Sequence, residues 1–560
     1  MKTNFDLQPA LLTKLKGYTK EKFISDLLAG VIVSVVALPL AIAFGMASGV
    51  SPEKGLITAI VGGFTVALLG GCSAQIAGPT GAFIVILYGI IENFGFEGLV
   101  VSTVMAGVIL MILGFLKMGT FIKFIPYPIV VGFTSGIAIT IFTSQVKDLF
   151  GLTVENLPSE FIYKWGAYFD AIHTTDLYTL GVGLLTILII IFTPKISKKV
   201  PGSLVALILM TVVSYILRNQ YGVDTVETIG DKFTITSTLP TLHWIKVDFA
   251  MINELLPSAV TLALLCAMES ILSAIVADGV TGDRHDSNME LVAQGAANIL
   301  SPLFGGIPVT GAAARTLTNI GNGAKSPVAG IIHAIVLLLI LVFLAPLTRL
   351  IPMACLAGVL AVVSYNMADF KTFRSLLKGP KSDVSVLLAT FFLTMIFDLT
   401  IAIMVGLLMA MILFMNRIAN LTKISVVIDK LQLNNDGDIE NSQHEELAIA
   451  DGVEVYEIDG PFFFGVANKF DSIVSYIGNT PKVRVIRMRK VPFIDVTGVH
   501  NLQMMVRSSH TEGIKIILSG VNDKVRNTLE RAGFNDLIGE EYICSNIHEA
   551  LDEANKFAKA

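Results

Sequence analysis

The chain has 560 residues, of which 53% are hydrophobic and 15% are charged, and its mean hydropathy is +0.71. These values exclude an ordinary soluble enzyme. The net charge of -5 comes with no basic block, so nothing indicates a nucleic-acid partner. The four cysteines are scattered without metal-ligand spacing, and we therefore expect no metal site, no cofactor and no disulfide.

Residues 1–25 are polar and basic, with Lys14, Lys16, Lys20 and Lys22, and apolar runs follow as far as about residue 418. The hydropathy pattern predicts fourteen membrane segments, at 27–47, 56–70, 79–91, 98–116, 127–146, 178–193, 202–217, 256–276, 291–304, 309–320, 327–346, 352–366, 383–397 and 399–416. Seven precede residue 220 and seven follow residue 255, which predicts an inverted repeat of two halves. Segments 79–91 and 309–320 are shorter than the roughly 20 residues of a full span, which indicates half-helices.

Lysine and arginine are more frequent in the loops on the side of the N-terminus, for example at Lys117, Arg284, Lys325 and Lys371. The positive-inside rule places these loops in the cytoplasm, and an even number of spans places both termini there. We therefore expect a multi-pass protein of the cell's inner (plasma) membrane, embedded in the lipid bilayer.

The composition becomes polar after about residue 430. Strand patterns occur at 453–458, 483–488 and 514–518, and helical patterns occur near 467–478, 498–511, 523–533 and 546–558. This order predicts a small α/β domain. The predicted organisation is a cytoplasmic N-terminal segment at 1–25, a transmembrane domain at 26–418, a linker at 419–450 and the α/β domain at 451–560.

A break rich in glycine and proline interrupts the apolar pattern between Phe304 and Arg315, in the sequence Phe-Gly-Gly-Ile-Pro-Val-Thr-Gly-Ala-Ala-Ala-Arg. Pro308 has no N–H to donate, so a helix should begin just after it, near Val309 or Thr310. The N–H groups of its first turn favour negative charge, and Arg315 lies one turn further on.

A similar break occurs upstream, where Pro79-Thr80-Gly81-Ala82 echoes Pro308-Val-Thr-Gly-Ala312. Two interrupted helices at corresponding places in two halves of a membrane chain indicate the central site of a transporter. We interpret the pair as a site for a small anion. The alternative is that both breaks are tight helix-packing turns, because small residues also let helices approach closely.

Glu269 lies inside the segment at 256–276. A carboxylate in the membrane is costly, so it must face water or a partner, and a proton-carrying role fits that position. The alternative is a structural pair with Arg315 or a hydrogen bond to a half-helix. Phe44, beyond the kink expected at Pro39, could line a cavity or belong to the core packing.

Several motifs together resemble the SulP family, the sulfate permease and bicarbonate transporter group. They are Asp26-Leu-Leu-Ala-Gly30 with Ala37-Leu-Pro39, Gly78-Pro-Thr-Gly81, Gly132-Phe-Thr-Ser-Gly136, Val276-Ala-Asp-Gly-Val-Thr-Gly282, Asn288 with Glu290-Leu291, and Gly305-Gly-Ile-Pro308 before Arg315. The C-terminal domain resembles a STAS domain, with Ile494-Asp-Val-Thr-Gly498 at the family's characteristic turn. The resemblance implies a mobile core and a gate, a substrate between the third and tenth segments, and a homodimer.

Carried over by position, the resemblance implies which residues surround the anion. They are Thr80, Gly81, Ala82, Ala313, Ala314 and Arg315, with Phe44 nearby. Glu269 would be the coupling acid, for protons rather than sodium, because some sodium-using bicarbonate members carry Asp there. Thr497 matches a phosphorylation position of related soluble STAS proteins, but as a helix N-cap it needs no regulatory role.

The predicted function is secondary active transport of sulfate, bicarbonate or a dicarboxylate, coupled to protons, by an elevator-like movement of the core. Two alternatives use the same residues. One is a passive anion channel, and the other is an anion sensor that signals through the STAS domain. No nucleophile, phosphate-loop or metal motif supports an enzyme.

Overall fold

The computed structural model describes residues 7–559, apart from 121–124, 155–156, 159, 197–200, 234–238, 243–248, 398, 428–429, 433–445 and 467–480. The chain forms two compact units, Met1–Ala410 and Met411–Ala560. We call them the membrane unit and the C-terminal unit, and describe each by itself.

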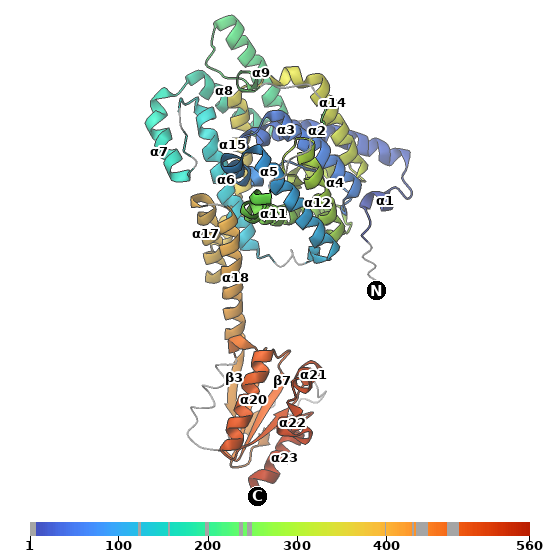
Figure 1. The fold of residues 1–560 in the computed structure, drawn as a ribbon, viewed down its shortest axis with the longest axis vertical. Helices are drawn as coiled ribbons and strands as arrows, with labels where there is room; N and C mark the ends of the chain where they lie inside the picture. Colours follow the sequence, from blue (N-terminus) through green and yellow to red (C-terminus); the bar gives the residue numbers. More distant parts are fainter. Residues whose placement is uncertain are drawn as a thin grey trace. The chain divides into compact units, whose positions relative to one another are not determined.

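The first half of the membrane unit is mainly helical (Figure 1). A short extended segment lies between α4 and α5. Its main elements are α1 (Ala10–Lys14), α2 (Lys20–Ala47), α3 (Pro52–Ile57), the π-helix η1 (Thr58–Gly62), α4 (Gly63–Leu69), β1 (Ala77–Gly78), the short helix η2 (Gly81–Phe83), α5 (Ile84–Phe115), α6 (Tyr127–Phe150), α7 (Phe161–Ala171), α8 (Leu177–Ile196) and α9 (Gly202–Tyr221). α5 is bent at Gly95, where φ is 67°, so its two parts correspond to the predicted segments 79–91 and 98–116.

The second half repeats this pattern, with an extended segment between α12 and α13. Its elements are α10 (Ile229–Lys232), α11 (Phe249–Thr281), α12 (Ser287–Leu303), β2 (Thr310–Gly311), α13 (Ala313–Gly321), α14 (Val328–Thr348), α15 (Met353–Ala368), α16 (Phe370–Leu376), α17 (Lys381–Ile396) and α18 (Leu399–Leu421). Each of the fourteen predicted segments overlaps a helix, which confirms the predicted membrane fold. The first membrane helix, α2, begins at Lys20, earlier than predicted, because Thr19 caps it by accepting a hydrogen bond from Lys22 N.

The helices of the membrane unit pack in two groups. In one, α5 packs against α11 and α12, and α14 packs against α2 and α4. In the other, α6 packs against α15 and α17, and α8 packs against α9 and α15. Glycines allow the closest approach: a Cβ added at Gly107 would lie 2.7 Å from the carbonyl oxygen of Gly295. We call the first group the core and the second group the gate, after the two parts that the family resemblance implies.

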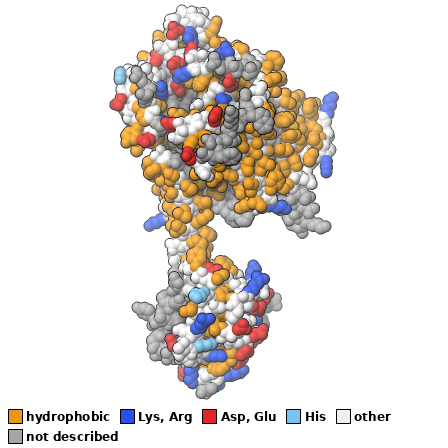
Figure 2. All heavy atoms as spheres, in the orientation of Figure 1, with side chains coloured by type: hydrophobic (Ala, Val, Ile, Leu, Met, Phe, Trp, Pro, Cys, Tyr) orange, Lys and Arg blue, Asp and Glu red, His pale blue; other side chains and the backbone are white. Residues whose placement is uncertain are grey.

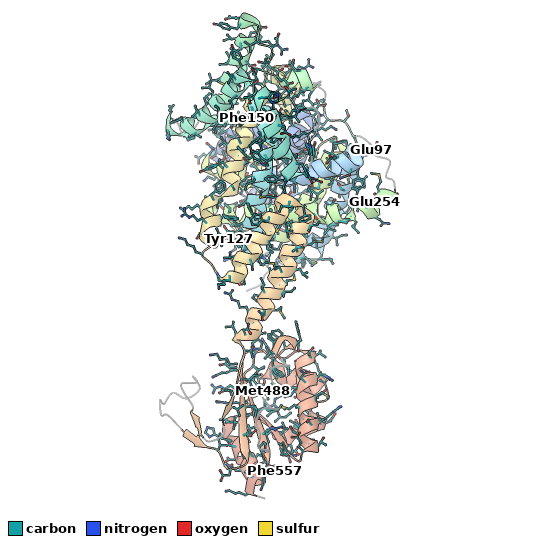
Figure 3. The ribbon with its side chains drawn as sticks, turned by 90° about the vertical axis from the view of Figure 1, so that its left-hand side faces the viewer. Glu97, Tyr127, Phe150, Glu254, Met488 and Phe557 are labelled. Atoms are coloured by element: carbon teal, nitrogen blue, oxygen red, sulfur yellow. The ribbon has the colours of Figure 1, made fainter. Side chains whose placement is uncertain are left out.

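Apolar side chains cover a broad area of the membrane unit, and charged side chains gather near its upper end in the view of Figure 2. Among the described residues, nine helices are long and apolar enough to cross a bilayer. In Figure 3, Tyr127 and Phe150 mark the two ends of one of them, α6.

The C-terminal unit has a five-stranded sheet in the order β3-β6-β7-β8-β9. Its strands are β3 (Lys423–Val427), β6 (Val453–Asp459), β7 (Val483–Lys490), β8 (Lys515–Ser519) and β9 (Ile543–Cys544). β3 is antiparallel to β6, and the other neighbours are parallel. A separate ribbon pairs β4 (Lys430–Gln432) with β5 (Glu446–Ala448).

Hydrophobic clusters cover both faces of this sheet. One includes Met488, Leu502 of α20 (Val496–Thr511) and Leu529 of α21 (Asp523–Arg531). The other includes Val485 and packs against Phe557 of α23 (Ile547–Lys559). Figure 3 labels Met488 and Phe557, one from each cluster. The predicted α/β class is therefore confirmed.

The strand β3 lies inside the range 419–450, which we predicted to be a linker. Its five residues follow a long helix directly and pair with β6, which lies about 30 positions further along the chain, so the local sequence does not reveal this contact. The strand β9 is also absent from the prediction. The predicted helix at 467–478 lies outside the described residues.

Candidate functional site

The two interrupted segments lie side by side in the membrane unit. β1 and β2 are antiparallel, with Ala77 opposite Gly311 and Gly78 opposite Thr310. Each strand leads directly into a helical segment, η2 and then α5 after β1, and α13 after β2. Helix starts from the two halves of the chain therefore meet at one place, and the chain is extended there rather than continuously helical.

The extended backbone at this place is satisfied by polar side chains from neighbouring helices. Gly311 N donates to Ser270 Oγ at 3.0 Å, and Ile307 N donates to Thr58 Oγ1 at 2.7 Å. Asn298 donates to Val309 O at 2.8 Å and accepts from Val309 N at 3.0 Å. Non-helical backbone survives at membrane depth only with such partners, which explains the buried polar residues of α11 and α12.

The two helix starts themselves have no side-chain caps. Thr80 precedes η2 and Ala312 precedes α13, and neither side chain accepts a hydrogen bond from the first turn that follows it. Uncapped first-turn N–H groups carry partial positive charge and can bind an anion. Ala312 has no side-chain acceptor, and the Thr80 hydroxyl donates to Glu269 instead of capping, so neither first turn has the side-chain cap that Ser, Thr or Asp usually supplies.

Arg315 connects the two segments. Its side chain is 2% exposed, and Nη2 donates to the carbonyl oxygen of Pro79. Nη1 has no hydrogen-bond partner among the described residues and lies against Gly78, where an added Cβ would clash with it. The guanidinium of the second segment is therefore held by the first, away from lipid.

Glu269 of α11 is half-buried, and its Oε2 accepts a hydrogen bond from Thr80 Oγ1 at 3.0 Å. In the part of the chain that the structure describes, it forms no ion pair with Arg315 within 4.0 Å. Of the two structural alternatives raised above, the structure shows the hydrogen bond to the half-helix and not the ion pair. The carboxylate thus lies at the start of the first short helix.

Apolar side chains enclose the first helix start. A Cβ added at Gly81 would lie 3.0 Å from Met367 Sδ, 3.2 Å from Ile141 Cδ1 and 3.3 Å from Phe44 Cε1. Phe44 is 6% exposed, so it both packs in the core and contacts the segment. Met367 and Ile141 belong to the other helix group, and no pattern in the sequence places them here.

The remaining predicted residues differ in exposure. Ala82 is buried, whereas Ala313 and Ala314 of α13 are exposed. Sequence reasoning did not single out Gln75, which is 4% exposed and whose side-chain amide has no partner among the described residues. Its place directly before the first interrupted segment was the available signal.

Thr497 lies in the C-terminal unit. The structure corrects the prediction that it is a helix N-cap, because Asp495 caps α20 by accepting from Gly498 N at 2.7 Å. Asp495 also accepts from Phe464 N at 3.1 Å, and so ties two loops together. Thr497 is exposed on the first turn of the helix.

Comparison with known proteins gives family matches over most of the chain. The sulfate permease family model matches residues 23–390, and the STAS domain model matches residues 446–554. The chain is 38% identical over 533 residues to YvdB of Bacillus subtilis (strain 168), which carries a provisional assignment as a sulfate transporter, covering 94% of this chain and 97% of that protein. It is 30% identical to the bicarbonate transporter BicA of Picosynechococcus sp., covering 94% of each chain.

Solved structures agree with the fold. The murine Slc26a9 anion transporter in the inward-facing state superposes with a TM-score of 0.87 at 19% identity, covering 98% of this chain and 94% of that chain. The transmembrane domain of a cyanobacterial bicarbonate transporter BicA gives 0.61 at 30% identity, covering 70% of this chain and 98% of that domain. The relatives cited here are named as transporters, which agrees with the prediction that the chain is not an enzyme. This chain, a multi-pass membrane protein with a C-terminal STAS domain, belongs to the sulfate permease family.

Proposed function

We propose that this protein carries a small anion across the membrane by secondary active transport, coupled to protons. The observation that supports this most strongly is the meeting of two uncapped helix starts beside a buried arginine. Both features favour negative charge, and they come from corresponding places in the two halves of the chain.

The anion would bind in front of the β1–β2 pair. N–H groups from Gly81 and Ala82 on one side, and from Ala313 and Ala314 on the other, would donate to it. Arg315 is held by Pro79, so it would act mainly through its positive charge in a medium of low dielectric constant. Phe44 would close one side of the site.

Glu269 would couple the anion to a proton. Its carboxylate bonds to Thr80, which directly precedes the first helix start, so its charge lies beside the anion's expected position. An ionised Glu269 would repel the anion, and protonation would remove this repulsion. Proton and anion would then bind cooperatively and cross together. A proton is favoured over sodium, since no second carboxylate among the described residues bonds to Glu269 or Thr80.

Movement of the core group of helices against the gate group would carry the anion across. The contact between them at the site is apolar, made by Gly81 of the core with Met367 and Ile141 of the gate. Apolar surfaces without hydrogen bonds can slide without leaving buried polar groups unpaired. We further propose a homodimer in the inner membrane, with both termini in the cytoplasm.

Sulfate, bicarbonate and dicarboxylates are the candidate substrates, and the names of the relatives favour the first two. The test is uptake of labelled sulfate or bicarbonate into proteoliposomes that contain the purified full-length chain, with the other anions as competitors. An anion sensor would bind without uptake, and a passive channel would show uptake that a pH gradient does not drive. Either result would overturn the proposal.

The proton-coupling role is tested by Glu269→Gln, which keeps the shape of the side chain but cannot ionise. We expect uptake that no longer responds to a pH gradient, while exchange of internal for external anion continues. Glu254→Gln is the matched control, since Glu254 is an exposed residue of the same helix. Unchanged pH-gradient dependence in Glu269→Gln would assign coupling to another group.

A further inference from the structure

The N-terminal part of the membrane unit presents lysines interleaved with exposed apolar side chains. Lys16, Lys20 and Lys22 are exposed. In the part of the chain that the structure describes, none of these three pairs with an acid, and Lys22 Nζ donates only to the carbonyl oxygen of Gly17 at 3.3 Å. Their positive charge is therefore available to an external partner.

Apolar residues lie among these lysines on the same stretch. The exposed ones are Leu12 at 58%, Leu15 at 45%, Phe23 at 44% and Ile24 at 47%. Exposed apolar side chains continue along α2 at Leu27, Leu28 and Val31. The stretch is therefore continuous with a membrane-spanning surface, and interleaved basic and apolar residues are typical of a segment that lies in the interface of a bilayer.

The length of α2 places this stretch at the level of the head groups. The helix has 28 residues, from Lys20 to Ala47. At about 1.5 Å per residue it is roughly 42 Å long, while the hydrocarbon core is about 30 Å thick. Since Lys20, Glu21 and Lys22 are charged, the excess length lies at this end, outside the hydrocarbon.

Contacts hold the stretch against the rest of the membrane unit. Ala10 N donates to Gly70 O at 2.8 Å, and Lys14 Nζ bonds to Asp283 at 2.6 Å. Tyr18 donates to Asp26 at 2.6 Å. Burial and this hydrogen bond raise the pKa of Tyr18 to about 12, so the phenol keeps its proton and continues to donate.

We propose that residues 12–24 form a binding surface for the head groups of anionic phospholipids. Lys16, Lys20 and Lys22 would contact the phosphates, and Leu12, Leu15, Phe23 and Ile24 would insert among the upper acyl chains. Charge complementarity and continuity with the lipid-facing side of α2 support a lipid rather than a protein partner. Because α1 is tied to Gly70 and Asp283, lipid charge would help to set the position of the whole core group in the bilayer.

The experiment uses the full-length chain with Leu15→Cys, labelled with a thiol-reactive fluorophore, in nanodiscs. The four native cysteines are buried, so labelling is directed to the new one. Nanodiscs contain phosphatidylcholine alone or with phosphatidylglycerol, and a fraction of the lipid is brominated on its acyl chains to quench the fluorophore. We expect stronger quenching with phosphatidylglycerol, and loss of that difference at high salt.

The decisive variant changes Lys16, Lys20 and Lys22 together to glutamine. We expect the extra quenching that phosphatidylglycerol causes over phosphatidylcholine alone to fall by at least about tenfold. Each basic residue near the surface contributes separately to the attraction for anionic lipid. The matched control changes the exposed Lys371, Lys378 and Lys381 to glutamine and should keep the preference.

Two results would overturn the proposal: equal quenching in both lipid mixtures, or retention of the preference in the Lys16, Lys20 and Lys22 variant. Quenching that depends on whether a disc holds one or two copies, and not on lipid charge, would instead assign the surface to a second copy of the chain. Size-exclusion chromatography of each variant shows whether the fold is kept.

Discussion

The two interrupted segments are built from nearly the same residues but differ in what surrounds them. The first, after β1, has no charged side chain and is enclosed by Phe44, Ile141 and Met367. The second, after β2, carries Arg315 and is braced by hydroxyl and amide groups of α11 and α12. One segment thus receives an apolar enclosure and the other supplies a fixed charge.

This difference indicates a division of roles within a symmetric scaffold. The first segment includes both Thr80, which bonds to Glu269, and Pro79, which accepts from Arg315. The carboxylate of Glu269 in α11 and the guanidinium of Arg315 in α13 therefore both bond to the uncharged first segment. We infer that the first segment fixes the positions of the two charged side chains through hydrogen bonds. The second segment, through Arg315, supplies the positive charge that attracts the anion.

The largest effect should come from removing the charge of the second segment. We expect Arg315→Ala to lower the initial rate of tracer anion uptake about a hundredfold, as for other truncations of a buried charged group. Arg315→Lys keeps the charge without the planar fork, so an intermediate rate is expected. Arg374→Ala, on the exposed surface of α16, is the control.

Thermal unfolding distinguishes loss of function from loss of fold in this series. Arg315→Ala leaves the carbonyl of Pro79 without its donor, which costs about 1–3 kcal/mol of stability and should leave the protein folded. An alanine variant that keeps more than half of the uptake would show that the backbone dipoles suffice and that our division of roles is wrong.

A smaller effect is expected from the two glycines of the β1–β2 pair, Gly78 in β1 and Gly311 in β2. An alanine at Gly78 would clash with Arg315 Nη1, whereas an alanine at Gly311 would clash with the side chain of Gln75 and come within 3.2 Å of Ser270 Cα. We expect Gly78→Ala to lower uptake about tenfold, a change worth about 1.4 kcal/mol, because it displaces the charge. Gly311→Ala should lower uptake only about threefold and act mainly on stability.

Measuring the uptake and the melting temperature of both variants side by side tests directly whether the two segments have the roles that we assign to them. If Gly311→Ala impairs uptake more than Gly78→Ala at equal stability, the exact position of the guanidinium matters less than the shape of the second segment. The roles that we assign to the two segments would then have to be exchanged.

The sequence was sufficient to predict where the membrane helices are interrupted, because Gly and Pro change backbone preferences locally. Pro79, Pro308 and the glycines around them mark both breaks. It was not sufficient to predict that the breaks pair as strands, or that Arg315 donates to Pro79, since both are contacts between residues more than 230 positions apart in the chain. The apolar wall of Ile141 and Met367 is hidden for the same reason.

The C-terminal unit shows a similar limit on a smaller scale. Alternating apolar residues predicted β6, β7 and β8 correctly, because each strand is long enough to show its period. β9 has two residues, too few to show a period, and the short alternation of Lys423-Ile-Ser-Val426 in β3 was missed because it directly follows a long apolar helix. The start of α20 was misplaced because Asp495 and Thr497 are both residues that can cap a helix, and only the structure shows which one accepts from Gly498.

The smallest expected effect concerns the hydroxyl groups that correspond in the two segments. Thr80→Val removes the hydrogen bond to Glu269, so uptake should fall about threefold, roughly 0.7 kcal/mol, and the pH of half-maximal uptake should move upward because the carboxylate has lost a donor. Thr310→Val removes bonds to Ser270 Oγ and Cys266 O, which lowers stability without moving the pH profile. Both are nearly isosteric changes measured by uptake at a series of pH values. A pH profile that moves with Thr310→Val and not with Thr80→Val would place the proton-coupling group beside the second segment.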